Sequence, residues 1–417
     1  MLRSRIFTTL LLAALNTVTV AFALGGDWPQ WRGPNRDGLS TETGLLKEWP
    51  AGGPRLVWKA DGLGGGYSTP SVAGGRVFGT GYRGDDDIAW ALAADTGKQV
   101  WSTRLGKADH SFDMPDGPRS TPTVEGDLLY TLGGSGILVC LDTVTGVERW
   151  RKNFKEEFGG RMMSGWGFSE SLMVDGDKLI CTPGGKKGAV VALNKTTGAV
   201  LWQTRDFTDE AAYASTIVAE IGGVRQYIQL TGESLVGIGA NDGRLLWKAA
   251  RKGSIAVVPT PIYHDNHVYV TSGYGVGCNL FKVTHEGSQF KAQEVYANKD
   301  VQNHHGGVIL IGEHIYGHSD SKGWVCQEFK TGKIVWQNRG MGKGSLVYAD
   351  GHLYLRSEGG KGVVALVEAT PESYKETSRF DQPDRSNRNS WPHPVIANGK
   401  LYLRDQASLL CYDVKKR

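Results

Sequence analysis

Side chains that can stack on a flat ligand or hold a negative charge stand just before a series of short apolar segments. They are Tyr67, Arg119, Trp166, Phe168, Tyr213, His304, His305, Trp391 and His393. Aromatic rings stack on planar groups, and Arg and His form charge-assisted hydrogen bonds with anions. If these positions converge, they make either a site for a planar or anionic ligand or a channel filled by bulky side chains.

Other candidate motifs lack the context that their chemistry requires. Residues Gly79–Gly84 match the GxGxxG pattern, but no helix is expected after them, which argues against a dinucleotide site. Asp85–Asp87 could offer oxygens to calcium, yet they lack EF-hand spacing, and we expect a solvated acidic loop. Adjacent His304 and His305 should point to opposite faces of a strand, so at most one of them should reach a shared site. We therefore expect no metal, and no catalytic group can be named.

The elements that must position these residues repeat along the chain. A glycine followed four residues later by a tryptophan occurs five times, as Gly97/Trp101, Gly146/Trp150, Gly198/Trp202, Gly243/Trp247 and Gly332/Trp336. The spacing between tryptophans is about 45 residues, except that the last is about twice as long, so one repeat there lacks its tryptophan. Such a period indicates a solenoid or a propeller.

Each repeat has the composition of four short antiparallel strands. In the second one, a hairpin of residues 120–124 and 128–132 precedes an apolar strand over Ile137–Asp142. A turn with glycine follows, because glycine tolerates positive φ, and the next strand carries the tryptophan. Four strands per repeat predict a β-propeller blade.

The repeats predict an all-β propeller of eight blades, with seven as the alternative count because the fifth and seventh repeats are degenerate. They start near Ser68, Ser120, Ser169, Ser215, Thr260, Gly306, Ser345 and His393. The last repeat has only three strands before the chain ends. We expect the strand around Trp58, at residues 55–59, to complete it, which would close the ring and remove the open edge.

The repeat tryptophans, Trp58 included, and their glycines are interpreted as structural, each indole wedging between blades. Trp28, Trp31 and Trp49 precede the first blade and are expected to form a structural strap on the disc. The five cysteines, Cys140, Cys181, Cys278, Cys326 and Cys411, lack the spacing of a disulfide framework or a metal site. Several share a position where other repeats have Ala or Gly, so we interpret them as buried filler.

Composition and the N-terminus favour an exported protein. The chain of 417 residues contains 58 glycines, and its net charge of +4 is too balanced to indicate nucleic-acid binding. Arg3 and Arg5 near the start, a mostly apolar run over 6–23 and the Ala21-Phe22-Ala23 sequence fit a cleaved signal peptide. We predict a signal over 1–23, a strap over 24–54 and a propeller over 55–417. The mature protein is expected to be a periplasmic or secreted monomer without a membrane span.

The repeat resembles that of the pyrroloquinoline-quinone (PQQ)-like propellers, in which a small residue, Leu and Asp precede Thr-Gly and a later Trp. Cys140-Leu141-Asp142, Thr145-Gly146 and Trp150 carry this pattern. The opening segment 27–38, DWPQWRGPNRDG, is similar to the start of a group of secreted bacterial members. The resemblance covers essentially the whole mature chain and implies fold more strongly than activity.

Two branches of this family imply two functions. Quinone-dependent alcohol dehydrogenases hold PQQ and calcium over the axis with an Asp base, and many have adjacent cysteines, which this chain lacks. The other branch includes the non-enzymatic scaffold subunit of the outer-membrane β-barrel assembly machine, although no lipobox cysteine follows the apolar run here. We expect a non-catalytic binding or scaffold protein of the cell envelope with an envelope protein or a small planar or saccharide ligand as partner. The alternative is a PQQ-dependent dehydrogenase acting on alcohols or sugars.

Overall fold

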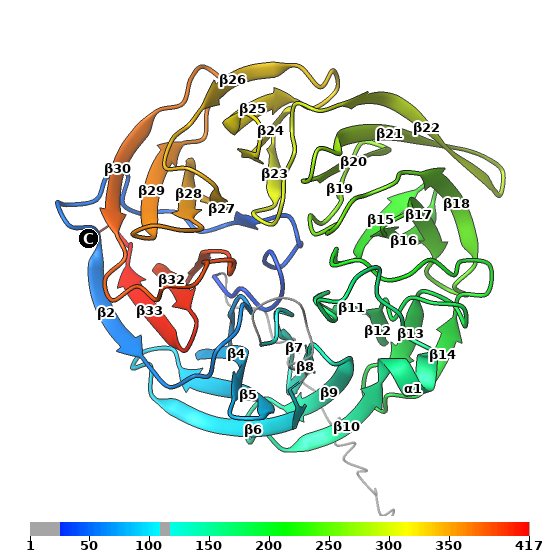
Figure 1. Cartoon of the computed structure of the whole chain (residues 1–417), viewed down its shortest axis with the longest axis horizontal. Helices are drawn as coiled ribbons and strands as arrows, with labels where there is room; N and C mark the ends of the chain where they lie inside the picture. The colour runs from blue at the N-terminus through cyan, green and yellow to red at the C-terminus, as the bar shows by residue number, and fades with distance from the viewer. Residues whose placement is uncertain (1–25, 109–116, 417) are drawn as a thin grey trace, which may run out of the picture.

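Eight β-sheets follow one another around a central axis like the blades of a propeller (Figure 1). The structure is a computed structural model, and it describes residues 26–108 and 117–416. The predicted export signal lies outside these residues. Within each blade, consecutive strands are antiparallel neighbours, and the outermost strand curves along the rim of the disc.

The first four blades follow the predicted repeat. Blade 1 contains β3 (Ser71–Ala73), β4 (Arg76–Arg83), β5 (Asp86–Ala93) and β6 (Gln99–Lys107). Blade 2 contains β7 (Thr123–Glu125), β8 (Leu128–Leu132), β9 (Ile137–Asp142) and β10 (Glu148–Asn153). Blade 3 contains β11 (Met173–Asp175), β12 (Lys178–Cys181), β13 (Val191–Asn194) and β14 (Val200–Gln203). Blade 4 contains β15 (Ile217–Ile221), β16 (Val224–Leu230), β17 (Ser234–Gly239) and β18 (Leu245–Ala250).

The last four blades include the degenerate repeats and the closure. Blade 5 contains β19 (Ile262–His264), β20 (His267–Ser272), β21 (Gly277–Glu286) and β22 (Gln289–Asn298). Blade 6 contains β23 (Val308–Ile311), β24 (His314–Ser319), β25 (Gly323–Glu328) and β26 (Ile334–Asn338). Blade 7 contains β27 (Gly344–Ala349), β28 (His352–Ser357), β29 (Val363–Glu368) and β30 (Glu376–Asp381), with β1 (Leu39–Ser40) parallel to β27. Blade 8 contains β31 (Val395–Ala397), β32 (Lys400–Asp405), β33 (Ser408–Asp413) and β2 (Arg55–Ala60).

The two ends of the propeller share one sheet, as predicted. Strand β2 pairs antiparallel with β33, with Trp58 opposite Cys411 and Ala60 opposite Leu409. This pairing satisfies the backbone groups at both ends and leaves no gap in the ring. The blade count of eight is therefore confirmed over the alternative of seven.

The repeat tryptophans stand directly opposite the small residues of the neighbouring strand. Trp150 pairs with Cys140 and Trp336 with Cys326, and the same register joins Trp101 to Ala91, Trp202 to Ala192 and Trp247 to Gly237. A large ring on one strand needs a small partner on the next, which explains the alternation of Cys, Ala and Gly. In the two degenerate blades, Tyr296 and Ser378 occupy the position of the tryptophan.

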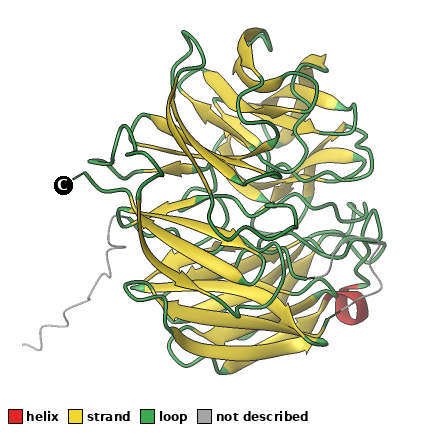
Figure 2. Ribbon diagram, turned by 60° about the vertical axis from the view of Figure 1, so that its left-hand side comes forward, coloured by secondary structure: helices red, strands yellow, loops and turns green. Residues whose placement is uncertain are grey.

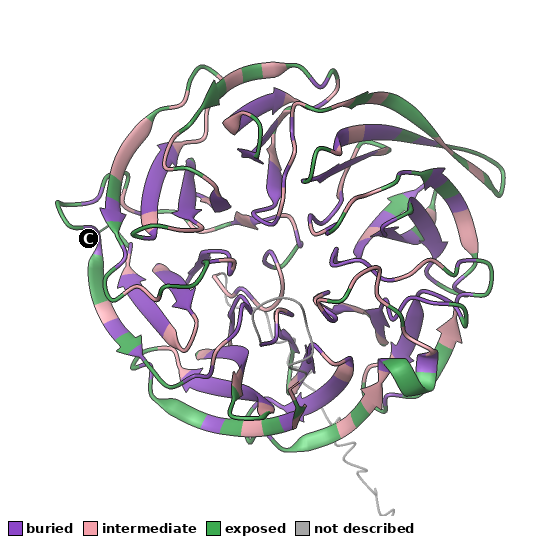
Figure 3. Cartoon of the chain, in the orientation of Figure 1, coloured by how far each residue is buried: buried purple, intermediate pink, exposed green. Residues whose placement is uncertain are grey.

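Burial decreases from the inner strands of each blade to its outer strand (Figure 3). The five cysteines are all buried and unpaired, in agreement with their predicted role as core filler. One short helix is described, α1 (Phe154–Phe158), which Asn153 caps at its N-terminus and which lies at the edge of the disc (Figure 2). Within residues 26–108 and 117–416, no helix has the length and apolar character needed to cross a bilayer.

Local differences from the sequence predictions are small. The inner strand of blade 2 begins at Thr123 rather than at Ser120, because Ser120–Pro122 form irregular chain beside the axis. Asp86 and Asp87 are the first residues of β5 rather than part of a loop, and Asp86 is ion-paired with Arg104 (2.9 Å).

Candidate functional site

The strap before β2 runs into the middle of the ring, where the inner edges of the blades meet (Figure 1). Its backbone bonds to blades 1, 2 and 7, through Trp28 with Val72, Pro29 with Val124, and Gly38 with Tyr348. Its side chains bond to the remaining blades: Arg36 to blades 3 and 4, Trp31 to Thr260 before blade 5, Arg32 to blade 6, and Ser40 to blade 8. The strap therefore contacts every blade.

Two buried arginines fix the strap to the ends of the inner strands. Arg36 donates to the carbonyl oxygens of Ser171 (2.7 Å), Leu172 (3.0 Å) and Thr216 (2.9 Å). Arg32 donates to the carbonyl oxygen of Val308 (2.6 Å). Burial lowers the pKa of Arg36 to about 9 and that of Arg32 to about 10, so both keep their positive charge at neutral pH. Asp37 near Arg32 and Glu170 near Arg36 offset part of this charge, although burial raises the pKa of Glu170 to about 7.

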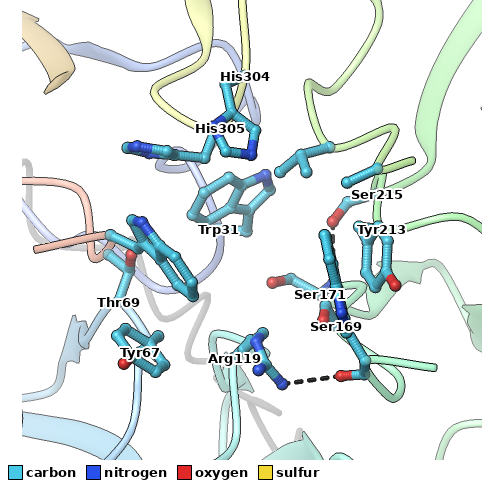
Figure 4. A pocket seen from close by; sticks show the side chains of 14 residues that line it. Trp31, Tyr67, Thr69, Arg119, Ser169, Ser171, Tyr213, Ser215, His304 and His305 are labelled. Carbon is cyan, nitrogen blue, oxygen red and sulfur yellow. Dashed lines mark hydrogen bonds between the residues drawn. The ribbon is translucent and has the colours of Figure 1, made fainter. Parts of the chain in front are cut away.

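A cavity lies on the axis above this strap (Figure 4). The space among its lining side chains, counted together with the open solvent at its mouth, is about 730 Å³. Its lining residues are Trp31, Tyr67, Thr69, Arg119, Trp166, Ser169, Ser171, Tyr213, Ser215, Ala256, Val258, His304, His305 and Trp391. They come from the strap and from the irregular segments that precede the inner strands of the blades, so ring closure and strap insertion together form the site.

Two pairs of aromatic rings form opposite sides of the cavity. Trp166 and Tyr213 are stacked, with ring centroids 6.0 Å apart and planes at 29°. Tyr67 and Trp391 have centroids 4.4 Å apart. In Figure 4, Tyr67 and Tyr213 lie on opposite sides of the space, and Trp31 from the strap is seen between them. Such walls suit a flat ligand body.

Arg119 contributes positive charge to the cavity. It donates to the carbonyl oxygen of Trp166 (2.9 Å), a bond drawn as a dashed line in Figure 4. Its guanidinium carbon lies 5.8 Å from the centroid of the Tyr67 ring. These contacts hold the guanidinium at the edge of the cavity between the two aromatic walls.

A network of charged and aromatic groups supports the histidine side of the cavity. Glu358 lies 3.2 Å from Nε2 of His305 and accepts a hydrogen bond from Nε1 of Trp391 (2.7 Å). Burial opposes ionisation of Glu358, but His305, Trp391 and Lys343 outweigh it and lower the pKa of the carboxyl group to about 2. Burial, His305 and Lys343 lower the pKa of His304 to about 3, so this imidazole is neutral at pH 7.

The structure brings seven of the nine predicted ring residues to this cavity: Tyr67, Arg119, Trp166, Tyr213, His304, His305 and Trp391. Phe168 instead packs edge-to-face on Phe154 between blades. His393 lies beneath the cavity, 4.6 Å from the Trp31 ring, and its Nε2 is 3.0 Å from the carbonyl oxygen of His305.

The expectation that at most one of His304 and His305 reaches the axis was wrong. Both line the cavity, because they lie in a bend before β23 rather than in a strand, so their side chains do not alternate. Their ring centroids are 5.2 Å apart.

Sequence reasoning missed two features of the site. The strap was interpreted as purely structural, yet Trp31 lines the cavity. The hydroxyls of Thr69, Ser169, Ser171 and Ser215 were also not identified. A signal for them existed, because a Ser or Thr recurs at the start of several repeats, where it marks the chain beside the axis.

The family model described as outer membrane protein assembly factor BamB matches residues 39–111 and 91–338, which is more than half of the sequence. The chain belongs to this family. A BamB protein from Yersinia pestis is 28% identical over 160 residues, which are 36% of each chain. One from Burkholderia pseudomallei is 25% identical over 282 residues, covering 58% of this chain and 71% of the relative.

The chain matches only part of the length of its curated BamB relatives, spanning 36%, 49% and 60% of three of them. Similarity also extends beyond the BamB proteins. A tetrathionate hydrolase from Acidithiobacillus ferrooxidans is 22% identical over 438 residues, covering 92% of this chain and 81% of the relative.

Solved structures share the fold at low sequence identity. BamB from Moraxella catarrhalis has a TM-score of 0.56 at 16% identity and covers 87% of this chain and 96% of its own. Quinohemoprotein alcohol dehydrogenase from Comamonas testosteroni has a TM-score of 0.54 at 11% identity, covering 95% and 82%. These structures support the fold of the BamB-family chain and carry no argument about its activity.

The cavity of this BamB-family chain does not fit PQQ with calcium. Calcium takes six to eight oxygen ligands, usually including carboxylates, and no Asp or Glu is among the lining residues that the structure describes. Residues 26–108 and 117–416 also contain no group of three or more His, Cys, Asp or Glu side chains that could hold a metal ion. The cavity therefore offers stacking and hydrogen-bond donors without a calcium cradle.

Proposed function

We propose that this chain is a non-catalytic binding and scaffold protein of the cell envelope and that the axial cavity is its small-ligand site. The observation that carries the proposal is the composition of that cavity. Aromatic rings, hydroxyls, imidazoles and one arginine line it, and such groups can bind and orient a ligand. Membership of the BamB family supports the scaffold role.

The alternative is a PQQ-dependent dehydrogenase, which the fold allows. Such an enzyme needs a calcium ion and a carboxylate base at the cofactor, and the described lining residues include neither Asp nor Glu. The five thiols are buried, and Cys140, Cys326 and Cys411 pair with tryptophans inside blades, so they cannot contact a ligand on the axis. The donor set therefore favours binding over quinone chemistry.

The proposed location is the periplasm or the exterior of the cell, and the proposed mature form is a monomer. The sequence pattern of residues 1–23 supports export, and the BamB relatives support an envelope role. An envelope protein is the proposed macromolecular partner.

The cofactor trial separates the two functions. The full chain is incubated with PQQ and calcium, desalted, and examined for a bound chromophore and for dye reduction with alcohols and sugars. We expect neither chromophore nor turnover. Retention of PQQ together with substrate-dependent dye reduction would overturn the non-catalytic proposal.

The scaffold role is tested by expressing the tagged full chain in a Gram-negative host and fractionating the cells. We expect the chain in the periplasmic or membrane fraction, eluting with a protein partner at a size above 45.3 kDa, the mass of the full sequence before cleavage of the signal. Recovery in the cytoplasm, or elution alone from a mild envelope extract, would contradict this role.

A further inference from the structure

We infer that the axial cavity binds a small, flat aromatic compound carrying a single carboxylate, with the acid group at a floor of hydroxyls and the ring between the aromatic walls. This inference rests on the proposed function in that it takes the axial cavity as the ligand site. It adds the chemical class of the ligand, which neither the fold nor the family determines.

The hydroxyls that line the cavity, which we call its floor, belong to Thr69, Ser169, Ser171 and Ser215. Their O–H groups can donate hydrogen bonds, but the described residues offer them no acceptor. Oγ of Ser171 accepts the backbone N–H of Thr121 (2.9 Å), and Oγ of Ser215 accepts that of Ser171 (2.9 Å). Oγ1 of Thr69 likewise accepts the N–H of His393 (2.9 Å). Because each oxygen already serves as an acceptor, the remaining O–H group is directed elsewhere, and no described residue accepts from it.

Ser169 strengthens this point. Its Oγ is buried and has no hydrogen-bond partner among the described residues, although it lines the same cavity. Nδ1 of His305 is also buried there without a partner. Buried hydroxyls without a partner also occur away from the cavity, at Ser120 and Ser345, so the position of Ser169 on the cavity is what makes its Oγ available to a ligand. A ligand oxyanion beside Ser169 and Ser171, which lie together in Figure 4, would satisfy both hydroxyls, whereas Thr69 lies on the other side of the space.

The electrostatic environment selects an anion of low charge. Arg119 is the one Arg or Lys among the described lining residues, and Arg36 donates to the carbonyl oxygen of Ser171, with Glu170 close enough to offset part of the charge of Arg36. No carboxylate among those lining residues opposes a bound anion. The hydroxyls and Arg119 can hold one carboxylate, whereas a second one on the side of His305 and Trp391 would meet the ionised Glu358 behind these residues.

The same donor pattern argues against a neutral sugar. Sugar hydroxyls need acceptors as well as donors, and the described lining side chains include no Asp, Glu, Asn or Gln to accept from them. Aromatic walls suit both classes, so the polar floor decides between them. A flat acid uses all three features of the cavity, namely the walls, the guanidinium and the hydroxyl donors.

The test compares two probes of the same shape, 2-naphthoate and its neutral isostere 2-naphthamide, by calorimetric titration into the full chain. We expect naphthoate to bind at least about tenfold more tightly than naphthamide, the effect of one charge-assisted hydrogen bond. Naphthalene-2-sulfonate separates a requirement for carboxylate from one for any oxyanion. Methyl glucoside and PQQ are titrated in parallel.

Variants link the acid preference to the floor. Ser169→Ala and Arg119→Gln should each weaken naphthoate about tenfold while changing naphthamide by less than about twofold. Ser71→Ala is the matched control, since its Oγ is also buried without a partner but does not line the cavity. Circular dichroism and thermal unfolding confirm that each variant is folded.

Equal binding of naphthoate and naphthamide would overturn the inference, as would tighter binding of methyl glucoside than of naphthoate. If PQQ bound more tightly than naphthoate but supported no turnover, the ligand would be a polycarboxylate rather than a monocarboxylate, and the inference would also be overturned. Failure of every probe would overturn the ligand class but leave the scaffold role to the envelope fractionation. PQQ-dependent turnover would instead overturn the proposed function.

Discussion

The indole Nε1 of Trp101 donates a hydrogen bond of 3.0 Å to the carbonyl oxygen of Thr143, which lies in the next blade. Trp58, Trp150 and Trp336 make the same bond to Ala94, Lys195 and Thr370. The ring also packs on the turn glycine of that blade, which leaves no room for a side chain there. This contact joins four pairs of neighbouring blades, whereas Nε1 of Trp247 donates to Oε1 of Gln226 in its own blade and Nε1 of Trp202 has no partner among the described residues. The packing of the ring on the turn glycine explains why glycine and tryptophan recur together.

Gly146→Ala should destabilise the protein by more than the backbone strain alone. Gly146 has φ 72°, and an added Cβ would lie 2.6 Å from Cδ2 of Trp101. Gly126→Ala is the matched control in the same blade, because its φ is 60° but nothing lies within 4 Å. We expect Gly126→Ala to cost about 1 kcal/mol and Gly146→Ala at least about 2 kcal/mol, measured by urea unfolding. Equal costs would show that the ring does not restrict the turn.

Trp150→Ala tests the tryptophan side of the contact. The substitution removes a half-buried ring and its 3.1 Å hydrogen bond to the carbonyl oxygen of Lys195. We expect a loss of about 3 kcal/mol in the free energy of unfolding. Val147→Ala, at a side chain that is 61% exposed, should change it by less than about 0.5 kcal/mol. Indistinguishable unfolding curves for the two variants would contradict the wedge role.

Arg36→Met tests whether the strap holds the blades together at the axis. The substitution leaves the carbonyl oxygens of Ser171, Leu172 and Thr216 buried without their donor. We expect a loss of about 3–5 kcal/mol, the range for breaking a buried charged contact. Arg339→Met, at an exposed arginine, is the control. A loss below about 1 kcal/mol for Arg36→Met would mean that the strap is not a structural hub.

The pH dependence of stability should report the buried histidine beneath the cavity. Burial, opposed by the hydrogen bond to His305 and assisted by the charge of Arg32, lowers the pKa of His393 from 6.5 to about 3. Between these values the unfolded chain binds a proton that the folded chain does not, so stability is lost as the pH falls below about 6.5.

His393→Gln is the matching variant, since glutamine does not titrate and can still donate to the carbonyl oxygen of His305. We expect the slope of unfolding free energy between pH 4 and pH 6 to be smaller in the variant by about 1.4 kcal/mol per pH unit. The slope rather than the absolute stability is compared, because the variant also loses contact with Trp31. Parallel slopes would show that His393 is protonated in the folded protein.

The blades could be predicted from the sequence because most of them repeat the same short pattern of a small residue, a turn glycine and a tryptophan. Gly146 and Trp150 are close in sequence, and the small residue opposite the tryptophan lies only one turn earlier, so the pattern is visible in a single repeat. The fifth and seventh repeats obscured it because Tyr296 and Ser378 replace the tryptophan. Ring closure was predictable because a strand without a partner at Trp58 matched a gap at the other end.

The site was only partly predictable because it depends on contacts between distant segments. Arg36 bonds to carbonyl groups that lie more than 130 residues away, and nothing in the local sequence specifies those partners. The same holds for Trp31, whose indole bonds to Thr260. His304 and His305 were misplaced because a two-residue alternation was assumed where the chain bends.

The central claim is that the closed ring and the inserted strap form a binding site on the axis. It is tested most directly by titrating 2-naphthoate into the wild-type chain and into a Trp166→Ala/Trp391→Ala double variant, with thermal unfolding as the folding control. We predict saturable binding at one site in the wild type and none in the folded double variant. An unchanged isotherm in the double variant would contradict the claim.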